Sequence, residues 1–375
     1  MAASTVTIEE VKSRKQRRRF LDFPFELYEG NPYWVPELLT ADIQALWKNP
    51  ALEFCKTRYF LASQNGKTVG RIAAIINQKE IEKTGRSLAR FGWVDFVDDP
   101  EVTAALFGEA EAWVKSEGVE AIHGPLGFTD LDREGMLIEG FEELGTIATN
   151  YNYPYYKEHL ERLGYQKSTD WVEFEIEVPD EVDPRVREFS RKIAERFKIR
   201  ELGATNKNQF KPYIPKVFDL LDEAYADLYG TVPLTEKQVK FYAEQYFGFI
   251  NPDFVAIVLN EHDELVGFGI TMPSMSKAFQ KARGRLFPFG FIHILKATKK
   301  NDRADFYLVA VRKDYQRKGV QALLFDKIWN TFIRFGIKKV ETNPELEYNT
   351  AVQAMWSNYK PRQHKRRRCF IKELS

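Results

Sequence analysis

Apolar and polar positions alternate along the chain in a layout that occurs twice. The stretches "YFLASQNGKTVGRIAAIIN" (59–77) and "FVAIVLNEHDELVGFGITM" (254–272) each contain an apolar run, a polar turn and a second apolar run that opens on Val-Gly. Two apolar runs joined by a short polar turn predict a β-hairpin. Each half of the chain is therefore expected to contain one hairpin, and the sequence indicates a weak internal duplication.

The segments after each hairpin follow the same order. In the first half a strand ("RFGWVDFV") precedes a helix, a short strand ("EAIHGP"), a Tyr-rich helix and a long strand ("DWVEFEIEV"). In the second half the order is "DFYLVAV", a helix, "KKVETNP", a helix around "NTAVQAMW" and a final strand, "RRRCFIKEL". This alternation predicts an α/β fold, that is, α+β with a mixed sheet. The polar segment 178–186 separates a predicted N-terminal half, 1–180, from a C-terminal half, 185–375.

Several helix ends have local signals. Pro100 suits the first position of a helix, and Gly118 suits the position just past its end. Gly336 closes a second apolar-periodic helix, and Thr235–Gln238 ("TEKQ") has the pattern of a capping box. These signals predict helices over roughly 100–117, 320–335 and from 236 onward.

Composition narrows the class of protein. The 375 residues are 44% hydrophobic, which is enough for a substantial core, and the 55 Lys and Arg nearly balance the 54 Asp and Glu. A near-neutral total gives no reason to expect a nucleic acid as partner. Two cysteines without metal-ligand spacing indicate a reducing compartment, and no stretch approaches the about 18 apolar residues of a membrane span. We expect a cytoplasmic protein without a membrane span.

A short basic turn stands between the strand Tyr307–Val311 and the helix that follows. It contains Arg312, Lys313, Gln316, Arg317 and Lys318, and Gly319 ends it. A helix N-terminus offers unpaired amides and a partial positive charge, and glycine lets the backbone approach phosphate oxygens closely. The turn suits a phosphate or pyrophosphate, although a plain surface turn explains these residues equally well.

The segment "VRKDYQRKGVQALL" resembles the acyl-CoA-binding turn of the GNAT acyltransferase superfamily, Q/R-x-x-G-x-G/A. Gln316 to Gly319 match its first four places, Val320 fills the free fifth place, and Gln321 stands where Gly or Ala is preferred, with Ala322 one place late. The order of elements around the turn also matches. The resemblance implies a duplicated GNAT fold whose second half binds acyl-CoA, while Asp95, Asp98, Asp99 and Glu101 replace the phosphate turn in the first half.

The resemblance also implies a chemistry. Members transfer an acyl group directly from CoA, as acetyl-CoA or a longer acyl-CoA, to an amine, without a metal. An amide near Ala310 or Val311 would stabilise the thioester oxygen. If Asn349 is the motif asparagine, the usual tyrosine position falls on Met355, so Tyr348 is the substitute acid, and Glu341 is the chosen base among Glu341, Glu345 and Glu347. The expected CoA-binding residues are Ala310, Val311, Gln316, Arg317, Lys318, Gly319, Val320, Gln321, Ala322 and Asn349.

Two alternatives stay open. Bacterial ceramide synthases are similarly long GNAT-type chains, and the Phe-rich segment "GRLFPFGFIHILK" (284–296) suits a long acyl chain or peripheral contact with a membrane, although core packing has the same composition. The acceptor would then be a lipid amine rather than a small-molecule amine. The substitution at Gln321 and the missing tyrosine also fit a non-catalytic, regulatory CoA-binding module.

Overall fold

The computed structural model describes residues 5–374. The elements of the first half are β1 (Thr7–Glu10), α1 (Arg14–Leu27), α2 (Leu39–Lys48), β2 (Cys55–Gln64), β3 (Lys67–Asn77), α3 (Gln78–Thr84), β4 (Leu88–Phe96), α4 (Pro100–Ser116), β5 (Ala121–Gly124), β6 (Met136–Glu139), α5 (Tyr155–Arg162) and β7 (Gln166–Glu177). Those of the second half are α6 (Pro184–Phe197), β8 (Arg200–Glu201), α7 (Ile214–Tyr225), α8 (Glu236–Phe247), β9 (Val255–Leu259), β10 (Leu265–Pro273), α9 (Ser276–Ala282), α10 (Gly290–Lys299), β11 (Arg303–Val311), α11 (Gln321–Phe335), β12 (Lys339–Glu341), β13 (Glu345–Leu346), α12 (Thr350–Gln353) and β14 (Arg362–Glu373). Short 3-10 helices cover Pro50–Glu53, Lys207–Tyr213, Pro252–Phe254, Lys313–Tyr315 and Ala354–Tyr359.

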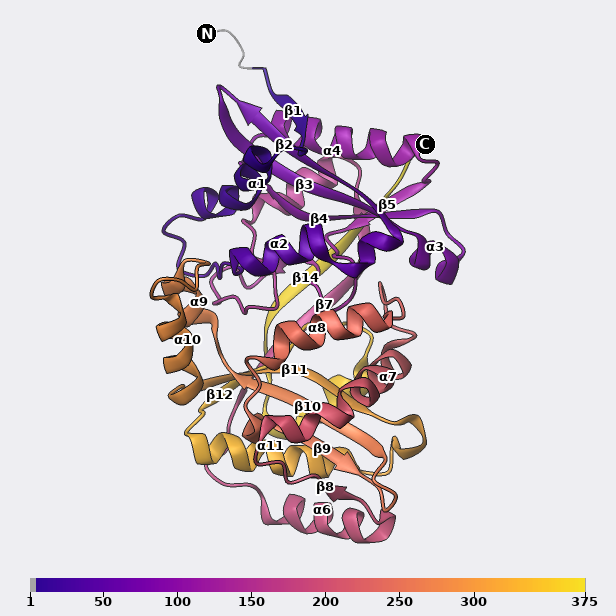
Figure 1. Ribbon diagram of the computed structural model, residues 1–375, viewed down its shortest axis with the longest axis vertical. Coiled ribbons are helices and arrows are strands. Elements are labelled where there is room, and N and C mark those ends of the chain that lie inside the picture. Colours follow the sequence, from indigo (N-terminus) through magenta and orange to yellow (C-terminus); the bar gives the residue numbers. More distant parts are fainter. Residues whose placement is uncertain (1–4, 375) are drawn as a thin grey trace.

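One sheet runs the length of the molecule and joins the two halves (Figure 1). Its strand order within the described residues is β1-β2-β3-β4-β5-β14-β7-β12-β11-β10-β9-β8, with β6 added to β14 and β13 added to β7. The hairpins β2–β3 and β9–β10 stand at corresponding places toward the two ends of the sheet. The predicted mixed α/β fold with a duplicated plan is confirmed.

The two halves exchange their final strands. β7, which ends the first half, pairs with β12 of the second half, and β14, which ends the second half, pairs with β5 of the first half. The two exchanged strands also pair with each other in antiparallel fashion along most of their length. The segment around residue 180, where the halves were predicted to separate, leads from β7 into α6. Each half therefore depends on a strand supplied by the other.

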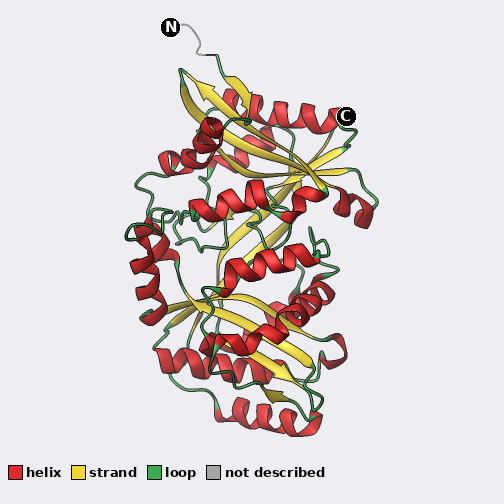
Figure 2. Cartoon of the chain, in the orientation of Figure 1, coloured by secondary structure: helices red, strands yellow, loops and turns green. Residues whose placement is uncertain are grey.

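The helices cover both faces of the sheet (Figure 2). In the first half α4 packs on β2 and β3, and the core there includes Phe91, Phe96, Phe107 and Trp113. In the second half α11 packs on β9 and β10, over a core that includes Trp329. Helix α7 contacts β10 and β11 and covers a further apolar cluster, and α8 packs beside α7.

The cations of β14 form ion pairs with acidic residues of the nearby strands β7 and β12. Lys365 pairs with Glu341 and Glu173, and Arg367 pairs with Glu173, all within the interior. Arg366 and Arg368 both pair with Asp170 of β7. Because buried charges are costly unless they are paired, these contacts disfavour any other register of the exchanged strands.

Candidate functional site

Strands β11 and β12 run parallel and then part. Only three residue pairs join them, from Arg303–Lys339 to Asp305–Glu341, after which β12 ends and β11 continues to Val311. The register between β10 and β11 shifts at Tyr307, where a β-bulge re-aims that side chain. The second half of β11 therefore has an edge that no strand covers.

Register shows which backbone groups face this edge. The amide of Arg312 donates to the carbonyl of Val266 on β10 at 2.8 Å, and Ala310 lies opposite Phe268 in the same register. Because hydrogen-bonding direction alternates along an antiparallel strand, the amide of Ala310 faces β10, whereas those of Val309 and Val311 face the open edge. Val311 is thus the better placed of the two predicted amide donors.

The basic turn lies at the end of this edge. The Gln316 side chain donates to the carbonyl of Val311 at 3.1 Å, which folds the turn back on β11. Helix α11 has no side-chain cap. Within residues 5–374, the amides of Arg317, Gly319, Val320 and Gln321 form no hydrogen bond. Four unpaired amides in one turn have the donor chemistry that suits an anion.

Three of the four cations of the turn have no acidic partner within the described residues. Arg312 is bound to Asp314 and Glu264, but Lys313, Arg317 and Lys318 form no ion pair within the described residues. Gly319 has a φ of 82°, and a Cβ there would lie 2.9 Å from the ring of Phe189 on α6. Any other residue at this position would therefore strain the turn.

The first half has the same parting strands, but its own chain fills the gap. β4 and β5 pair over three residues, and the amide of Leu126 then donates to the carbonyl of Phe91 on the free edge of β4 at 2.8 Å. A Cβ on Gly92 would lie 2.3 Å from the Leu126 carbonyl oxygen. The following helix, α4, is capped by Asp99, whose side chain accepts from the amide of Glu101 at 2.9 Å. The first half therefore lacks both an opening and an anion-binding turn.

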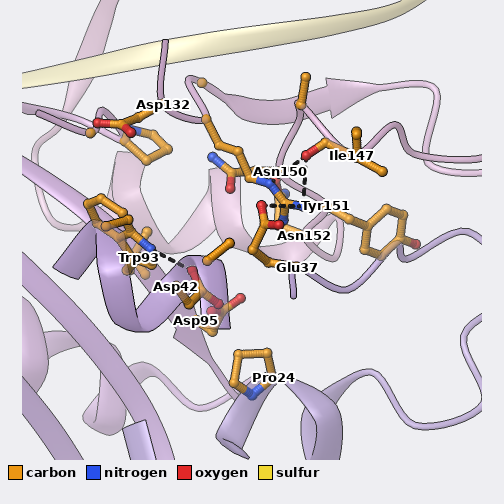
Figure 3. A pocket seen from close by; sticks show the side chains of 18 of the residues that line it. Pro24, Glu37, Asp42, Trp93, Asp95, Asp132, Ile147, Asn150, Tyr151 and Asn152 are labelled. Carbon is orange, nitrogen blue, oxygen red and sulfur yellow. Dashed lines mark hydrogen bonds and ion pairs between the residues drawn. The ribbon is translucent and has the colours of Figure 1, made fainter. Parts of the chain in front are cut away.

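Three neighbouring cavities share lining residues where the two halves face each other. The first, here called the slot, lies between β11 and the β12–β13 segment, and its lining includes Leu308, Val309 and Asn343. The second, the apolar chamber, extends from Tyr307, Leu308 and Asn343 between β9–β10 and the helices α7 and α8. The third, the acidic chamber, lies in the first half and is shown in Figure 3. Asp132 and Ala148 line all three cavities.

The acidic loop "GFTDLDREG" (127–135) stands at this junction. Asp130 lines both the slot and the apolar chamber, and no side chain is bonded to its carboxylate within the described residues. Burial is the main cause that raises the pKa of Asp130 to about 6, and the charge of Asp222 adds to it. A carboxylate with a pKa near neutrality is suited to accept a proton.

Asp132 has a different environment. Its carboxylate accepts from the amides of Phe128 and Thr129 at 2.7 and 3.1 Å and from the hydroxyl of Tyr242 at 3.3 Å. Burial raises its pKa to about 6 in spite of these bonds. With both oxygens engaged, Asp132 holds the loop, and Asp130 carries the freer carboxylate.

The acidic chamber is built from paired charges. Arg71 binds Asp95 at 2.7 Å and Arg133 lies 3.2 Å from Glu37, while the indole of Trp93 donates to Asp42 at 3.1 Å. In Figure 3 these carboxylates point toward a common space. The chamber offers several acceptors to a ligand that carries hydrogen-bond donors.

The predicted catalytic residues lie elsewhere. Glu341 is buried beneath Lys365 and lines none of the three cavities; burial alone would raise its pKa, but Lys365 and His364 together lower it to about 2. Tyr348 is 57% exposed and also lies outside the cavity linings. Asn349 does line the slot. Glu341 is thus part of a buried ion pair rather than of a cavity wall. The slot lies between Asn349 and the edge of β11.

Sequence reasoning missed the acidic loop and two tyrosines. Tyr225 and Tyr307 both line the slot, and the hydroxyl of Tyr225 donates to the carbonyl of Val309 on the open edge at 3.4 Å. A signal for the loop was present, because Asp130, Asp132 and Glu134 alternate between glycines directly after the short strand of the first half.

Similar structures define the class of fold. The tandem GNAT protein from the clavulanic acid biosynthesis pathway, determined without acetyl-CoA, matches with a TM-score of 0.57 at 12% identity over 99% of both chains. A GCN5-related N-acetyltransferase from Sphaerobacter thermophilus matches with a TM-score of 0.54 at 10% identity over 98% of this chain and 96% of its own. The chain has a two-halved GNAT-like fold, and the resemblance seen in the sequence is confirmed.

Two proteins are similar over nearly their whole length. Protein YghO of Escherichia coli (strain K12) is 29% identical over 370 residues, which cover 96% of this chain and 94% of that protein. A bacterial ceramide synthase of Caulobacter vibrioides is 26% identical over 385 residues, which cover 98% of each. No family model matches the chain.

Two features are absent from the described residues. Residues 5–374 contain no group of three or more His, Cys, Asp or Glu side chains arranged to hold a metal ion. None of the helices in this range combines the length and the apolar character that crossing a bilayer requires.

Proposed function

We propose that this protein is an acyl-CoA-dependent N-acyltransferase whose co-substrate binds in the second half. One observation carries the proposal: β11 and β12 part to form the slot, and the open edge of β11 ends at a basic turn with four unbonded amides. A CoA molecule needs both features, because its pantetheine arm resembles an extended peptide and its pyrophosphate is an anion.

The binding residues follow from that placement. The amides of Arg317, Gly319, Val320 and Gln321 would receive the pyrophosphate, and Lys313 and Lys318 would add charge-assisted bonds. The arm would lie along β11 and bond to the amides of Val309 and Val311, with Asn349 across the slot. Gln316 holds the turn through Val311, and Ala322 lies in the first turn of α11.

The chemistry requires a base, an oxyanion donor and an acid. We assign Asp130 as the general base for the acceptor amine, because its unpaired carboxylate lies at the junction of the cavities and its pKa is about 6. As the amine attacks the thioester carbon, the carbonyl oxygen gains charge, which the amide of Val309 or Val311 would stabilise. The C–S bond then breaks, and the Tyr225 hydroxyl at the edge of β11 would protonate the departing thiolate.

The apolar chamber favours a long acyl group. It opens from the slot at Tyr307 and Leu308, and its walls are mostly apolar, with Phe210, Val217, Leu221, Ile257 and Phe268 among them. An acetyl group would leave this space empty, whereas a long chain would fill it. The similarity to a bacterial ceramide synthase supports a lipid amine as acceptor, with its polar end in the acidic chamber.

A binding experiment tests the CoA site. Lys318→Glu places a negative charge beside the turn, and we expect the Kd for CoA in isothermal titration calorimetry to rise at least about tenfold, the equivalent of one charge-assisted hydrogen bond. Lys240→Glu, an exposed residue of α8, makes the same change in net charge and is expected to leave the Kd unchanged. Equal affinities for the two variants would remove the turn from the site.

An activity experiment tests the reaction. The protein would be incubated with acetyl-CoA or palmitoyl-CoA and a panel of small and long-chain amines, and the free thiol that is released would be measured. Thiol release that depends on both acyl-CoA and amine is the expected result. If CoA binds but no amine is acylated, the non-catalytic CoA-binding module is the better description.

A further inference from the structure

The segment between β10 and β11 has an unusual outer surface. Five of the nine exposed large hydrophobic residues of the described chain lie within nine positions: Phe287, Phe289, Phe291, Ile292 and Leu295. Phe287 is 78% exposed and Phe289 is 69% exposed. Single exposed apolar residues are ordinary on a protein surface, but a contiguous group marks an interaction site.

Cations surround this apolar group without acidic partners. No Asp or Glu occurs from residue 265 to residue 301, although the chain as a whole is nearly neutral. Six exposed cations lie within 281–300: Lys281, Arg283, Arg285, Lys296, Lys299 and Lys300. None of the six forms an ion pair or a side-chain hydrogen bond within residues 5–374. We call the five apolar residues and six cations the α10 surface.

The opposite side of the same segment is firmly held. The side chain of Gln280 on α9 donates to the carbonyls of Pro32 and Trp34 in the first half, each at 2.9 Å, and the Leu39 amide donates to the carbonyl of Gly284 at 2.9 Å. Met275, Phe279 and Ile294 are buried against Val35 and Leu38. The α10 surface therefore stands on a rigid support, on the flank of the molecule where the halves meet (Figure 1).

The support of the α10 surface borders a cavity. Phe279 of α9 and Met275, just before that helix, line the apolar chamber and also pack in one cluster with Ile294 of α10. Helix α9 and its N-cap thus separate the chamber from α10.

We propose that the α10 surface docks on the headgroup region of an anionic phospholipid bilayer. Aromatic and aliphatic side chains flanked by unpaired Lys and Arg are the composition that inserts into a lipid interface. A nucleic acid duplex would use the cations but not the protruding phenylalanines, and an ordinary protein interface is depleted in lysine. The inference does not depend on the proposed reaction, because docking is measured without any turnover.

Sedimentation with lipid vesicles tests the proposal. The full chain would be mixed with vesicles of phosphatidylcholine alone or of phosphatidylcholine with phosphatidylglycerol, and the bound fraction measured at low and high salt. We expect binding to the anionic vesicles, weaker binding in high salt, and little binding to pure phosphatidylcholine.

Two variants separate the apolar and the charged contributions. Phe287→Ser with Phe289→Ser is expected to weaken binding at least about tenfold. Lys296→Glu with Lys299→Glu is expected to weaken it by more than about fivefold for each cation lost. Ile43→Ser and the pair Arg14→Glu with Lys15→Glu are matched controls on exposed positions elsewhere, and both should bind as the parent does.

Three outcomes would overturn the proposal. The first is no binding to anionic vesicles. The second is binding that falls in the Arg14→Glu, Lys15→Glu control and not in the α10 variants. The third is a dimer in light scattering that the Phe287→Ser, Phe289→Ser variant dissociates, because the surface would then be an interface between copies of this chain. Thermal melting of each variant verifies that it is folded.

Discussion

Lys365 of β14 and Glu341 of β12 form a buried ion pair although β7 lies between their strands. The side chain of Lys365 is 1% exposed and that of Glu341 is 6% exposed. The pair links the last strand of the chain to the strand that borders the slot, across the strand contributed by the first half. It therefore fixes the exchanged strands and the parting of β11 and β12 together.

Removing the cation of this pair should destabilise the whole fold. Lys365→Met removes the buried cation of Glu341 and leaves Glu173 with Arg367 as its remaining cation, and we expect the free energy of unfolding to fall by about 3–5 kcal/mol. Urea denaturation followed by circular dichroism measures the loss. Lys372→Met is the control: Lys372 lies on the same strand, β14, and forms a more exposed pair with Glu111 of α4, so its loss should cost no more than about 1 kcal/mol. Similar losses in both variants would mean that the buried pair has no special role.

The lowered pKa of Glu341 predicts how the stability of the fold responds to acid. The pKa of Glu341 is about 2 in the folded chain against an ordinary 4.5, so its contribution is fully present above pH 4.5 and is lost as the pH falls toward 2. Glu341→Gln removes this titrating group. We expect the melting temperature of the parent to fall more steeply than that of Glu341→Gln between these pH values. Parallel curves in differential scanning calorimetry would contradict the lowered pKa.

Local signals in the sequence predicted the ends of several helices, but they did not predict that the halves exchange their final strands. α4 begins at Pro100, Gly336 ends α11 in the left-handed conformation, and Thr235 caps α8 through a capping box, as their residues indicate. These features depend on a few neighbouring residues. Strand pairing depends on distant surfaces, and nothing within "DWVEFEIEV" says that it borders the other half. The acids of β7 and the cations of β14 are complementary, but that becomes evident only once their register is known.

The candidate site shows the same difference between features that depend on contiguous residues and features that depend on distant ones. The basic turn was visible in sequence because its proposed function depends on contiguous residues, from Gln316 to Gln321. The junction of the three cavities was not visible, because it brings Asp130 of the first half to Tyr307 of the second. Glu341 was a reasonable choice by position along the chain, yet its side chain points to Lys365 rather than into the slot. The direction of a side chain depends on packing, which spacing alone does not specify.

The assignment of Asp130 predicts a particular dependence on pH. Only its deprotonated form accepts a proton, so kcat/KM should rise with pH through an apparent pKa of about 6 and then level. Asp130→Asn should lower kcat at least about 100-fold with little change in the Kd for CoA, and the rise near pH 6 should disappear. Glu347→Gln, a loop carboxylate outside the slot, is the control and should keep the profile. A rise near pH 6 that survives in Asp130→Asn would assign the base to another group.

Two glycines of similar conformation give a matched test of the turn. Gly319 and Gly336 stand at opposite ends of α11 with φ values of 82° and 73°. Alanine should cost stability at both, by about 1 kcal/mol, because of the left-handed backbone. At Gly319 the new Cβ would also press on Phe189 and displace the amides of the turn, whereas Gly336 faces open space. We therefore expect CoA affinity to fall in Gly319→Ala alone, as measured by calorimetry, and equal affinities would argue against amide contacts with the pyrophosphate.

The apolar chamber predicts selectivity for the length of the acyl chain. Val217 on α7 lines the chamber, and Val217→Trp would fill part of it without reaching the basic turn. We expect kcat/KM for palmitoyl-CoA to fall at least about tenfold while the value for acetyl-CoA stays within about twofold, because only the long chain needs the lost space. Lys216→Trp, at the neighbouring exposed position of the same helix, adds the same side chain outside the chamber and should change neither value. Equal losses for both acyl-CoA substrates would indicate general damage to the fold, and no loss for palmitoyl-CoA would place the acyl chain outside the chamber.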